Sequence, residues 1–202
     1  MTVIGITGGT GAGKTTALDT VREMGGVIID CDAVYHGLTA NSTDMLREID
    51  ECFPGVVSGG VLQRRELGTI VFADESALLK LNSITHRYVK DEVNRTIKAH
   101  QASGGELAAI DAIALFESGL NEMCSFTVFI TAPKELRARR IMVREGISYD
   151  YAMLRIGAQK DDRYFESKCT YTLVNDFDTA DEFKKLCRKF FSEKVRCEHE
   201  QK

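Results

Sequence analysis

The chain has 202 residues, of which 44% are hydrophobic and 28% are charged, a composition typical of folded globular proteins rather than of disordered ones. This length is enough for one α/β core and too short for two full domains, so we expect a single domain over residues 1–202. The formal net charge of -4 excludes the strongly basic surface of a general nucleic-acid-binding protein.

Short apolar runs alternate along the chain with longer segments of helical periodicity, which is the pattern of a parallel sheet covered by crossover helices. Strands are predicted at Val3–Thr7, Val27–Asp30, Leu107–Ile113, Thr127–Thr131 and Tyr171–Val174. Helices are predicted at Lys14–Met24, Asp32–Leu38, Thr43–Glu51, Arg64–Phe72, Glu75–Ala102, Lys134–Arg144, Tyr149–Gln159 and Thr179–Phe191. The charged tail from Ser192 to Lys202 is expected to fray. This order predicts an α/β protein of three layers, α/β/α, with a five-stranded parallel sheet.

The first strand leads into a glycine-rich segment, Gly8 to Thr15, that matches G-x-x-x-x-G-K-[ST], the P-loop, at every fixed position. Glycines allow the positive φ angles that bring backbone N–H groups close to an oxyanion, and the following helix adds its positive N-terminus. Lys14 supplies a charge for the β- and γ-phosphates, and the Thr15 hydroxyl can bind Mg²⁺. The segment therefore predicts a nucleoside triphosphate site. The residues expected to hold the nucleotide are Gly9, Thr10, Gly11, Ala12, Gly13, Lys14, Thr15 and Thr16.

Carboxylates follow the second and third predicted strands, at the edge where parallel sheets place ligands. Asp30 and Asp32 come after the second strand, and either one alone could be the N-cap of the next helix. A carboxylate near the γ-phosphate can orient an acceptor hydroxyl and accept its proton, and we assign that role to Asp32. Asp111 follows the third strand, where P-loop proteins hold an acid near Mg²⁺, although a solvated strand end would look the same.

Three arginines, Arg137, Arg140 and Arg144, are spaced three and four apart and therefore share one face of the predicted helix, whereas Arg139 points elsewhere. Guanidinium groups on one face suit phosphate binding and charge neutralisation during transfer. Arginines on helices are also commonly solvated, so the spacing alone leaves both interpretations open. The polar, helix-like segment that follows is consistent with a lid, over about 137–168, that excludes water from the triphosphate.

Taken in order, these segments make the chain resemble dephospho-CoA kinase from Ile4 to about Asp178. The resemblance is carried by the P-loop, "DCD", "GVLQRRELGTIVF", "LNSITHRYV", "IDAIALFE", the three arginines and "RIGAQ". That family uses ATP and Mg²⁺ to phosphorylate the ribose 3′-hydroxyl of dephospho-CoA in the last step of coenzyme A synthesis. The resemblance implies the same reaction here, a P-loop fold with a helical lid, and a helical acceptor-binding insertion over about 38–103.

The resemblance also assigns catalytic roles to individual residues. Asp32 matches the family's acid that orients or deprotonates the acceptor hydroxyl, and Lys14 and Thr15 match the P-loop residues. Arg140 matches the lid arginine that meets the transferring phosphate. The resemblance thus favours the arginine face as part of the site, a choice that the spacing left open.

On the substrate side, Arg64 and His86 match positions that line the acceptor site, and Asn175 matches an N-x-G corner near the adenine. Taken by itself, His86 inside a predicted helix is more often a packed or surface residue. Asp111 and His36 are also expected near the acceptor, where His36 can replace the family's arginine as a donor. The chain departs from the family pattern at His36 for arginine, Arg87 and Ala114 for proline, and Phe177 for glycine.

Two other functions would share the triphosphate site. Another small P-loop kinase would phosphorylate a nucleoside or a nucleoside monophosphate with the same fold. A non-catalytic ATP-binding switch would act through a protein partner. A guanine-specific GTPase is disfavoured because the chain has no N-K-x-D and no D-x-x-G after the third strand.

The location is expected to be cytoplasmic. No apolar run approaches the roughly 20 residues needed to cross a bilayer, and the first residues lack the regions of a secretory signal. The six cysteines form no C-x-x-C pair, so reduced thiols are expected rather than a metal cage. We expect no membrane or nucleic-acid partner, and the sequence leaves the oligomeric state open.

Overall fold

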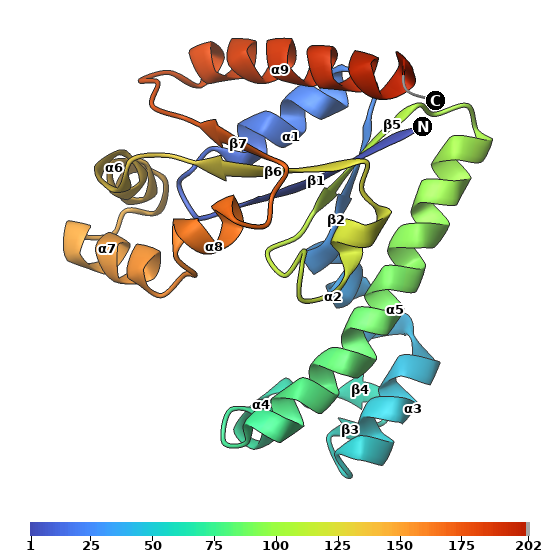
Figure 1. The fold of residues 1–202 in the computed structure, drawn as a ribbon. Coiled ribbons are helices and arrows are strands. Elements are labelled where there is room, and N and C mark those ends of the chain that lie inside the picture. Colours follow the sequence, from blue (N-terminus) through green and yellow to red (C-terminus); the bar gives the residue numbers. More distant parts are fainter. Residues whose placement is uncertain (201–202) are drawn as a thin grey trace.

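A five-stranded parallel sheet forms the centre of the structure, which is a computed structural model describing residues 1–200 (Figure 1). Its strands lie in the order β2-β5-β1-β6-β7, and every neighbouring pair is parallel. The bounds are Thr2–Gly8 for β1, Val27–Asp30 for β2, Leu107–Asp111 for β5, Phe126–Thr131 for β6 and Tyr171–Val174 for β7. The predicted α/β fold with five parallel strands is confirmed.

Helices cover both faces of this sheet and make it the middle of three layers (Figure 1). Helices α1 (Lys14–Glu23) and α9 (Ala180–Glu200) pack together on one face, whereas α2 (Cys31–Asn41) and α5 (Glu75–Ala102) pack on the other. The strands are apolar without alternation because both of their faces are buried. In β1, for example, Ile4 packs with the α1 and α9 side and its neighbour Val3 with the α2 and α5 side.

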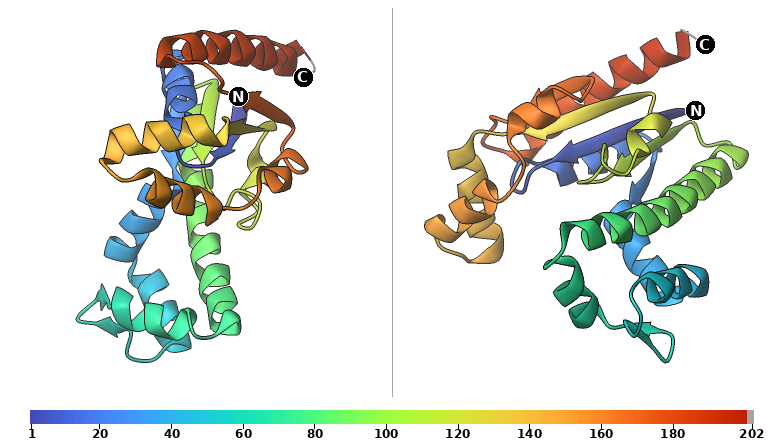
Figure 2. Two further views of the ribbon diagram at one scale, coloured as in Figure 1. Left: turned by 90° about the vertical axis from the view of Figure 1, so that its left-hand side faces the viewer. Right: turned by 60° about the horizontal axis from the view of Figure 1, so that its bottom comes forward.

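The segment after α2, together with the N-terminal half of α5, forms a second, smaller core beside the sheet (Figure 2). It contains α3 (Thr43–Cys52), α4 (Arg64–Val71) and a short hairpin of β3 (Val57–Ser58) and β4 (Val61–Leu62). The 28-residue α5 joins the two cores. Its C-terminal half packs on the sheet through Val93, and its N-terminal half packs against α3 and α4. Helix α5, together with Leu38 of α2, therefore ties this segment to the sheet.

Three helices lie beyond the carboxyl end of β6: α6 (Lys134–Glu145), α7 (Tyr149–Gly157) and α8 (Asp162–Glu166). Helices α6 and α7 pack on each other through a small apolar cluster of Ala138, Ile141, Ala152 and Ile156. Helix α8 is attached to the sheet through Phe165, whose ring stacks on Phe129 of β6 at 5.0 Å between centroids. The group is therefore held at the same edge of the sheet as the P-loop.

The structure differs from the predicted elements at several ends. Strand β5 ends at Asp111, before the predicted Ile113, because the chain there leaves the sheet as a turn. Helix α9 continues to Glu200, and Val195 packs against the core, so the tail expected to fray is helical as far as it is described; 201–202 lie outside the described residues. The hairpin, α8 and a 3-10 helix at Leu120–Met123 are too short to produce a periodic signal.

None of the helices within residues 1–200 has an apolar stretch sufficient to span a membrane.

Candidate active site

The P-loop connects β1 to α1 and surrounds a cavity of about 580 Å³. Gly11 and Gly13 have φ angles of 76° and 102°, a left-handed conformation that side chains rarely adopt, so these two positions require glycine. Gly13 is the N-cap of α1, whose free N–H groups and positive helix end face the loop. The local chain therefore has the geometry that binds a phosphate group. The cavity is lined, besides loop residues, by Ile113, Arg140, Arg144, Arg155 and Gln159.

Lys14 forms an ion pair with Asp111 at the carboxyl ends of the strands. Its Nζ lies 2.5 Å from Asp111 Oδ1, and the two side chains are 22% and 16% exposed. Burial raises the pKa of the Asp111 carboxyl; the Lys14 charge opposes this shift, and the charges of Asp30 and Asp32 add to it. Asp30 and Asp32 therefore lie near the Asp111 carboxylate that pairs with the P-loop lysine.

The two aspartates that follow β2 have different surroundings. Asp30 is the N-cap of α2, and its Oδ1 accepts a hydrogen bond of 3.0 Å from the N–H of Ala33. Asp32 lies in the first turn of α2, is exposed, and lines a cavity of about 220 Å³. The cap geometry therefore separates the two residues that the sequence could not distinguish, and it leaves Asp32 available for a ligand.

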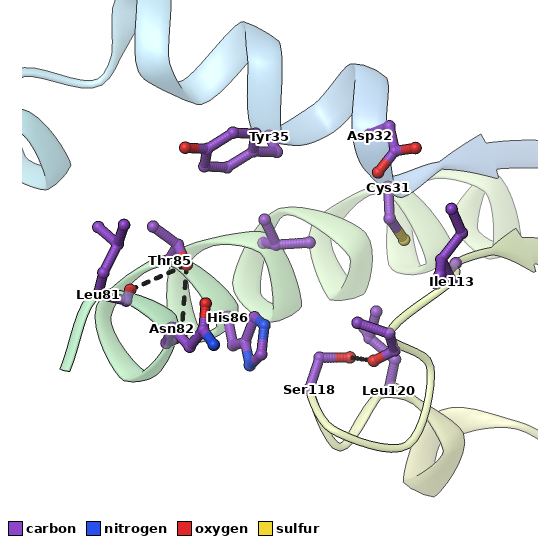
Figure 3. A pocket seen from close by; sticks show the side chains of 13 residues that line it. Cys31, Asp32, Tyr35, Leu81, Asn82, Thr85, His86, Ile113, Ser118 and Leu120 are labelled. Carbon is purple, nitrogen blue, oxygen red and sulfur yellow. Dashed lines mark hydrogen bonds between the residues drawn. The ribbon is translucent and has the colours of Figure 1, made fainter. Parts of the chain in front are cut away.

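The cavity beside Asp32 lies between α2, α5 and the loop after β5 (Figure 3). Asp32 and Tyr35 stand on the α2 side, with Asn82 and His86 on α5 opposite them (Figure 3). Burial lowers the pKa of His86, and the nearby charge of Glu117 opposes that shift. His86 is consequently neutral at pH 7 and can both donate and accept a hydrogen bond.

Arg64 and His36 meet at the far end of the same region. Arg64 Nη2 lies 3.2 Å from Nδ1 of His36 and donates a hydrogen bond of 3.1 Å to the Thr39 hydroxyl. A small cavity beside Arg64 shares Tyr35 and Leu81 with the cavity of Asp32, so the two cavities adjoin. Two residues expected on the acceptor side are thus in contact, although they are far apart in the sequence.

All three arginines of the shared helix face contact the P-loop. Arg137 is only 3% exposed, and its Nε donates a hydrogen bond of 3.0 Å to the carbonyl of Thr10. Arg144 Nη2 donates to the Thr10 hydroxyl at 3.1 Å, and Arg140 lines the loop cavity. Arg139 is exposed, as its position on the helix predicts. The docking of α6 thus places the face toward the loop, a direction that the spacing could not indicate.

Asn175 contacts the P-loop and is 4% exposed. Its Nδ2 donates a hydrogen bond of 2.9 Å to the carbonyl of Ala12, and its Oδ1 accepts one of 3.1 Å from Arg140 Nη2. Arg140 also donates to the carbonyl of Phe177 at 2.7 Å, so the position where the family has glycine serves here through its backbone. The structure shows Asn175 as a support of the loop and of Arg140, and the place near the adenine that the resemblance implied stays a prediction.

Two further groups were not assigned by the sequence. Gln159 accepts a hydrogen bond from the N–H of Thr10 at 3.1 Å. Glu117, in the loop after β5, accepts hydrogen bonds from Lys160 and from the hydroxyl of Tyr164, and so connects that loop to the segment around α8. Neither contact could have been found from spacing, because the partners are separated by more than 40 residues.

The sequence model and the similar proteins found by comparison point to one family. The sequence model of dephospho-CoA kinase matches residues 2–181. A dephospho-CoA kinase of Corynebacterium diphtheriae is 31% identical over 193 residues, which are 95% of this chain and 96% of that protein. The solved structure of TT1252 from Thermus thermophilus aligns with a TM-score of 0.70 and 30% identity over 95% of this chain and 97% of its own. Dephospho-CoA kinase from Campylobacter jejuni aligns with a TM-score of 0.67 over 96% and 97% of the two chains; at 24% identity, this likeness supports the fold.

Proposed function

The chain belongs to the dephospho-CoA kinase family, and we propose on that basis that it transfers the γ-phosphate of ATP to the ribose 3′-hydroxyl of dephospho-CoA, giving coenzyme A and ADP. The observation that carries the proposal is a set of adjoining cavities. Ile113 lines both the P-loop cavity and the cavity of Asp32, and a third cavity contains Gly9 of the loop together with His86 of α5. A triphosphate and an acceptor hydroxyl can therefore meet at this junction.

Each charged group at the junction suits one part of a phosphoryl transfer. Asp32 is exposed to the acceptor cavity, where its carboxylate would orient the 3′-hydroxyl and accept its proton. Lys14, now paired with Asp111, carries the charge for the β- and γ-phosphates. Arg140 and Arg144 line the P-loop cavity and would neutralise charge that develops on the transferred group.

We propose that ATP is used with Mg²⁺, and the donor set fits that ion. Mg²⁺ is usually bound by one or two protein oxygens together with substrate phosphates and water. Within residues 1–200, no three His, Cys, Asp or Glu side chains group into a cage of their own. The exposed Thr15 hydroxyl and, through water, the Asp111 carboxylate would hold the ion. When bound, Mg²⁺ neutralises phosphate charge.

The acceptor would extend from Asp32 toward the second core, and we propose that the helical segment over about 38–103 binds it. Asn82 and His86 would provide polar contacts near the reacting hydroxyl, and Arg64 with His36 would meet charged or polar groups farther along. The segment over about 137–168 would act as the lid, since α6 carries the arginines and Gln159 follows α7. Lid closure would exclude water, which competes with the acceptor.

A cytoplasmic location is part of the proposal. The six cysteines are all free, and Cys52 is exposed, as expected where thiols stay reduced.

Mass spectrometry after incubation with ATP, Mg²⁺ and dephospho-CoA tests the reaction, and a gain of one phosphate on the acceptor is the expected result. Turnover of a nucleoside monophosphate, with none of dephospho-CoA, would instead identify another small P-loop kinase. The role of Asp32 is tested by Asp32→Asn, which should lower kcat by about 10²- to 10⁴-fold with ATP affinity retained. Asp30→Asn is the matched control, because asparagine caps a helix as well as aspartate does. Equal activity losses in the two variants would contradict the assignment.

A further inference from the structure

Gln159 occupies a position at the P-loop that the reaction as described does not use. It follows the C-terminal end of α7, and its backbone N–H is bonded to the carbonyl of Ile156 at 3.2 Å. Its side chain lines both the P-loop cavity and the cavity that leads to His86. The side chain therefore stands where the triphosphate and acceptor parts of the cleft join.

The orientation of the Gln159 amide is determined by its partners. Its Oε1 accepts two hydrogen bonds, one of 3.1 Å from the N–H of Thr10 and one of 2.6 Å from Arg137 Nη2. Only the oxygen of an amide can accept these bonds, because the nitrogen is a donor. The NH₂ group is therefore directed away from both partners, and it donates to no other group within residues 1–200. Two N–H donors thus remain for a ligand in the cleft.

The surrounding residues hold this amide in place. Arg137 is 3% exposed, and its remaining donors bind the Thr10 carbonyl at 3.0 Å and Asp162 at 3.5 Å. Asp162 in turn accepts a hydrogen bond of 2.6 Å from the Thr131 hydroxyl of β6. A Cβ at Gly9 would lie 2.7 Å from the Gln159 oxygen, so this approach requires glycine there. The amide is therefore anchored to the loop, the sheet and α8 together.

We propose that Gln159 is a further catalytic residue, whose NH₂ group donates to an oxygen of the γ-phosphate during transfer, and that Arg137 is the positioning residue that fixes its orientation. The inference rests on the proposed kinase function. The γ-phosphate is the part of ATP nearest the acceptor, so a donor at the junction of the two cavities contacts it rather than the β-phosphate. A neutral amide suits this place, because it stabilises the phosphate oxygens without adding a charge that would bind the ADP product tightly.

Two substitutions separate this role from a purely structural one. Gln159→Glu keeps the oxygen that accepts from Thr10 and Arg137 and removes both donors, whereas Gln159→Met removes the oxygen and the donors without adding charge. For each variant, the affinities for ADP and for a non-hydrolysable imido analogue of ATP are measured by calorimetry, together with kcat. Gln101→Glu is the matched control, since Gln101 is exposed at the end of α5.

The proposal predicts that both variants bind ADP within about threefold of the wild type, bind the analogue about 10- to 100-fold more weakly, and lose a similar factor in kcat. If Gln159 were only structural, Gln159→Met would weaken binding of ADP and of the analogue equally, and this pattern overturns the proposal. Unchanged binding and turnover in Gln159→Glu overturns it as well, and that variant decides if Gln159→Met does not fold. Turnover of dephospho-CoA by the wild type is measured separately, so a failure of the proposed kinase function can be distinguished from a failure of the proposed role of Gln159.

Discussion

Replacing Asn175 by alanine is expected to lower the free energy of unfolding by about 2–4 kcal/mol even without nucleotide. The buried side chain donates to the carbonyl of Ala12, a residue with 0% exposure, and accepts from Arg140. Loss of a neutral hydrogen bond costs about 1 kcal/mol, and a buried carbonyl left without a donor adds about 1–3 kcal/mol. Loss of the Asn175 acceptor costs less free energy at Arg140, because its guanidinium group keeps the carbonyls of Gly11 and Phe177 as acceptors.

Urea unfolding followed by circular dichroism measures this effect. With a slope of about 2–3 kcal/mol per molar urea, the midpoint should fall by about 1 M. The control is Asp176→Ala, at the exposed neighbouring position, where a change within about 0.5 kcal/mol is expected. Nucleotide affinity should also fall, and it should fall for adenine and guanine nucleotides alike, because the damage lies in the loop that holds the phosphates.

The opposite pattern would refute this reasoning. An unchanged urea midpoint in Asn175→Ala, combined with a loss of binding confined to adenine nucleotides, would show that the side chain reads the base. Asn175 would then have the role that the sequence resemblance implied, and the contacts to Ala12 and Arg140 would carry little of the stability of the loop.

Three further substitutions test other parts of the site. Burial raises the pKa of Asp111 above its ordinary 3.8, so its protonated form stabilises the fold below that pH, and this contribution is lost as pH rises through the folded pKa. Asp111→Asn should therefore gain stability relative to the wild type in urea titrations from about pH 4 to 7. A loss of stability relative to the wild type over this range would contradict the expected sign. Glu117→Gln weakens the attachment of Lys160 and should speed amide exchange in α8 by about 5- to 10-fold while leaving α1 unchanged; equal exchange in both proteins counts against it. Gly9→Ala places a Cβ against the buried arginine on the loop and should cost about 2 kcal/mol or more, measured by thermal unfolding, whereas Gly37→Ala, with open space around it, should be neutral or stabilising.

The P-loop shows what a sequence can determine well. Its function depends on contiguous residues, since the glycines, Lys14 and the start of α1 act within one turn of chain. The five strands were predicted for a related reason, because each apolar run is long enough to show burial on both faces. The two-residue strands β3 and β4 have no such period, and they are defined by their pairing with each other.

The carboxylates after β2 show the limit of local reasoning. Asp30 and Asp32 are the same residue type two positions apart, and either one could cap the helix, so the sequence does not distinguish them. The structure separates them through one hydrogen bond, from the Ala33 N–H to Asp30, which leaves Asp32 in the cavity wall. The choice depended on where α2 begins, and helix ends are set by such contacts rather than by periodicity.

The sequence by itself determined the phosphate-binding loop, the α/β class and the shared face of Arg137, Arg140 and Arg144, since each of these follows from spacing along a single element. Only the tertiary structure decided that this face meets the P-loop, that Asn175 supports the loop from below, and that Gln159 reaches the N–H of Thr10. The physical reason is that spacing specifies a direction around a helix axis, whereas the group that fills that direction depends on how distant segments pack.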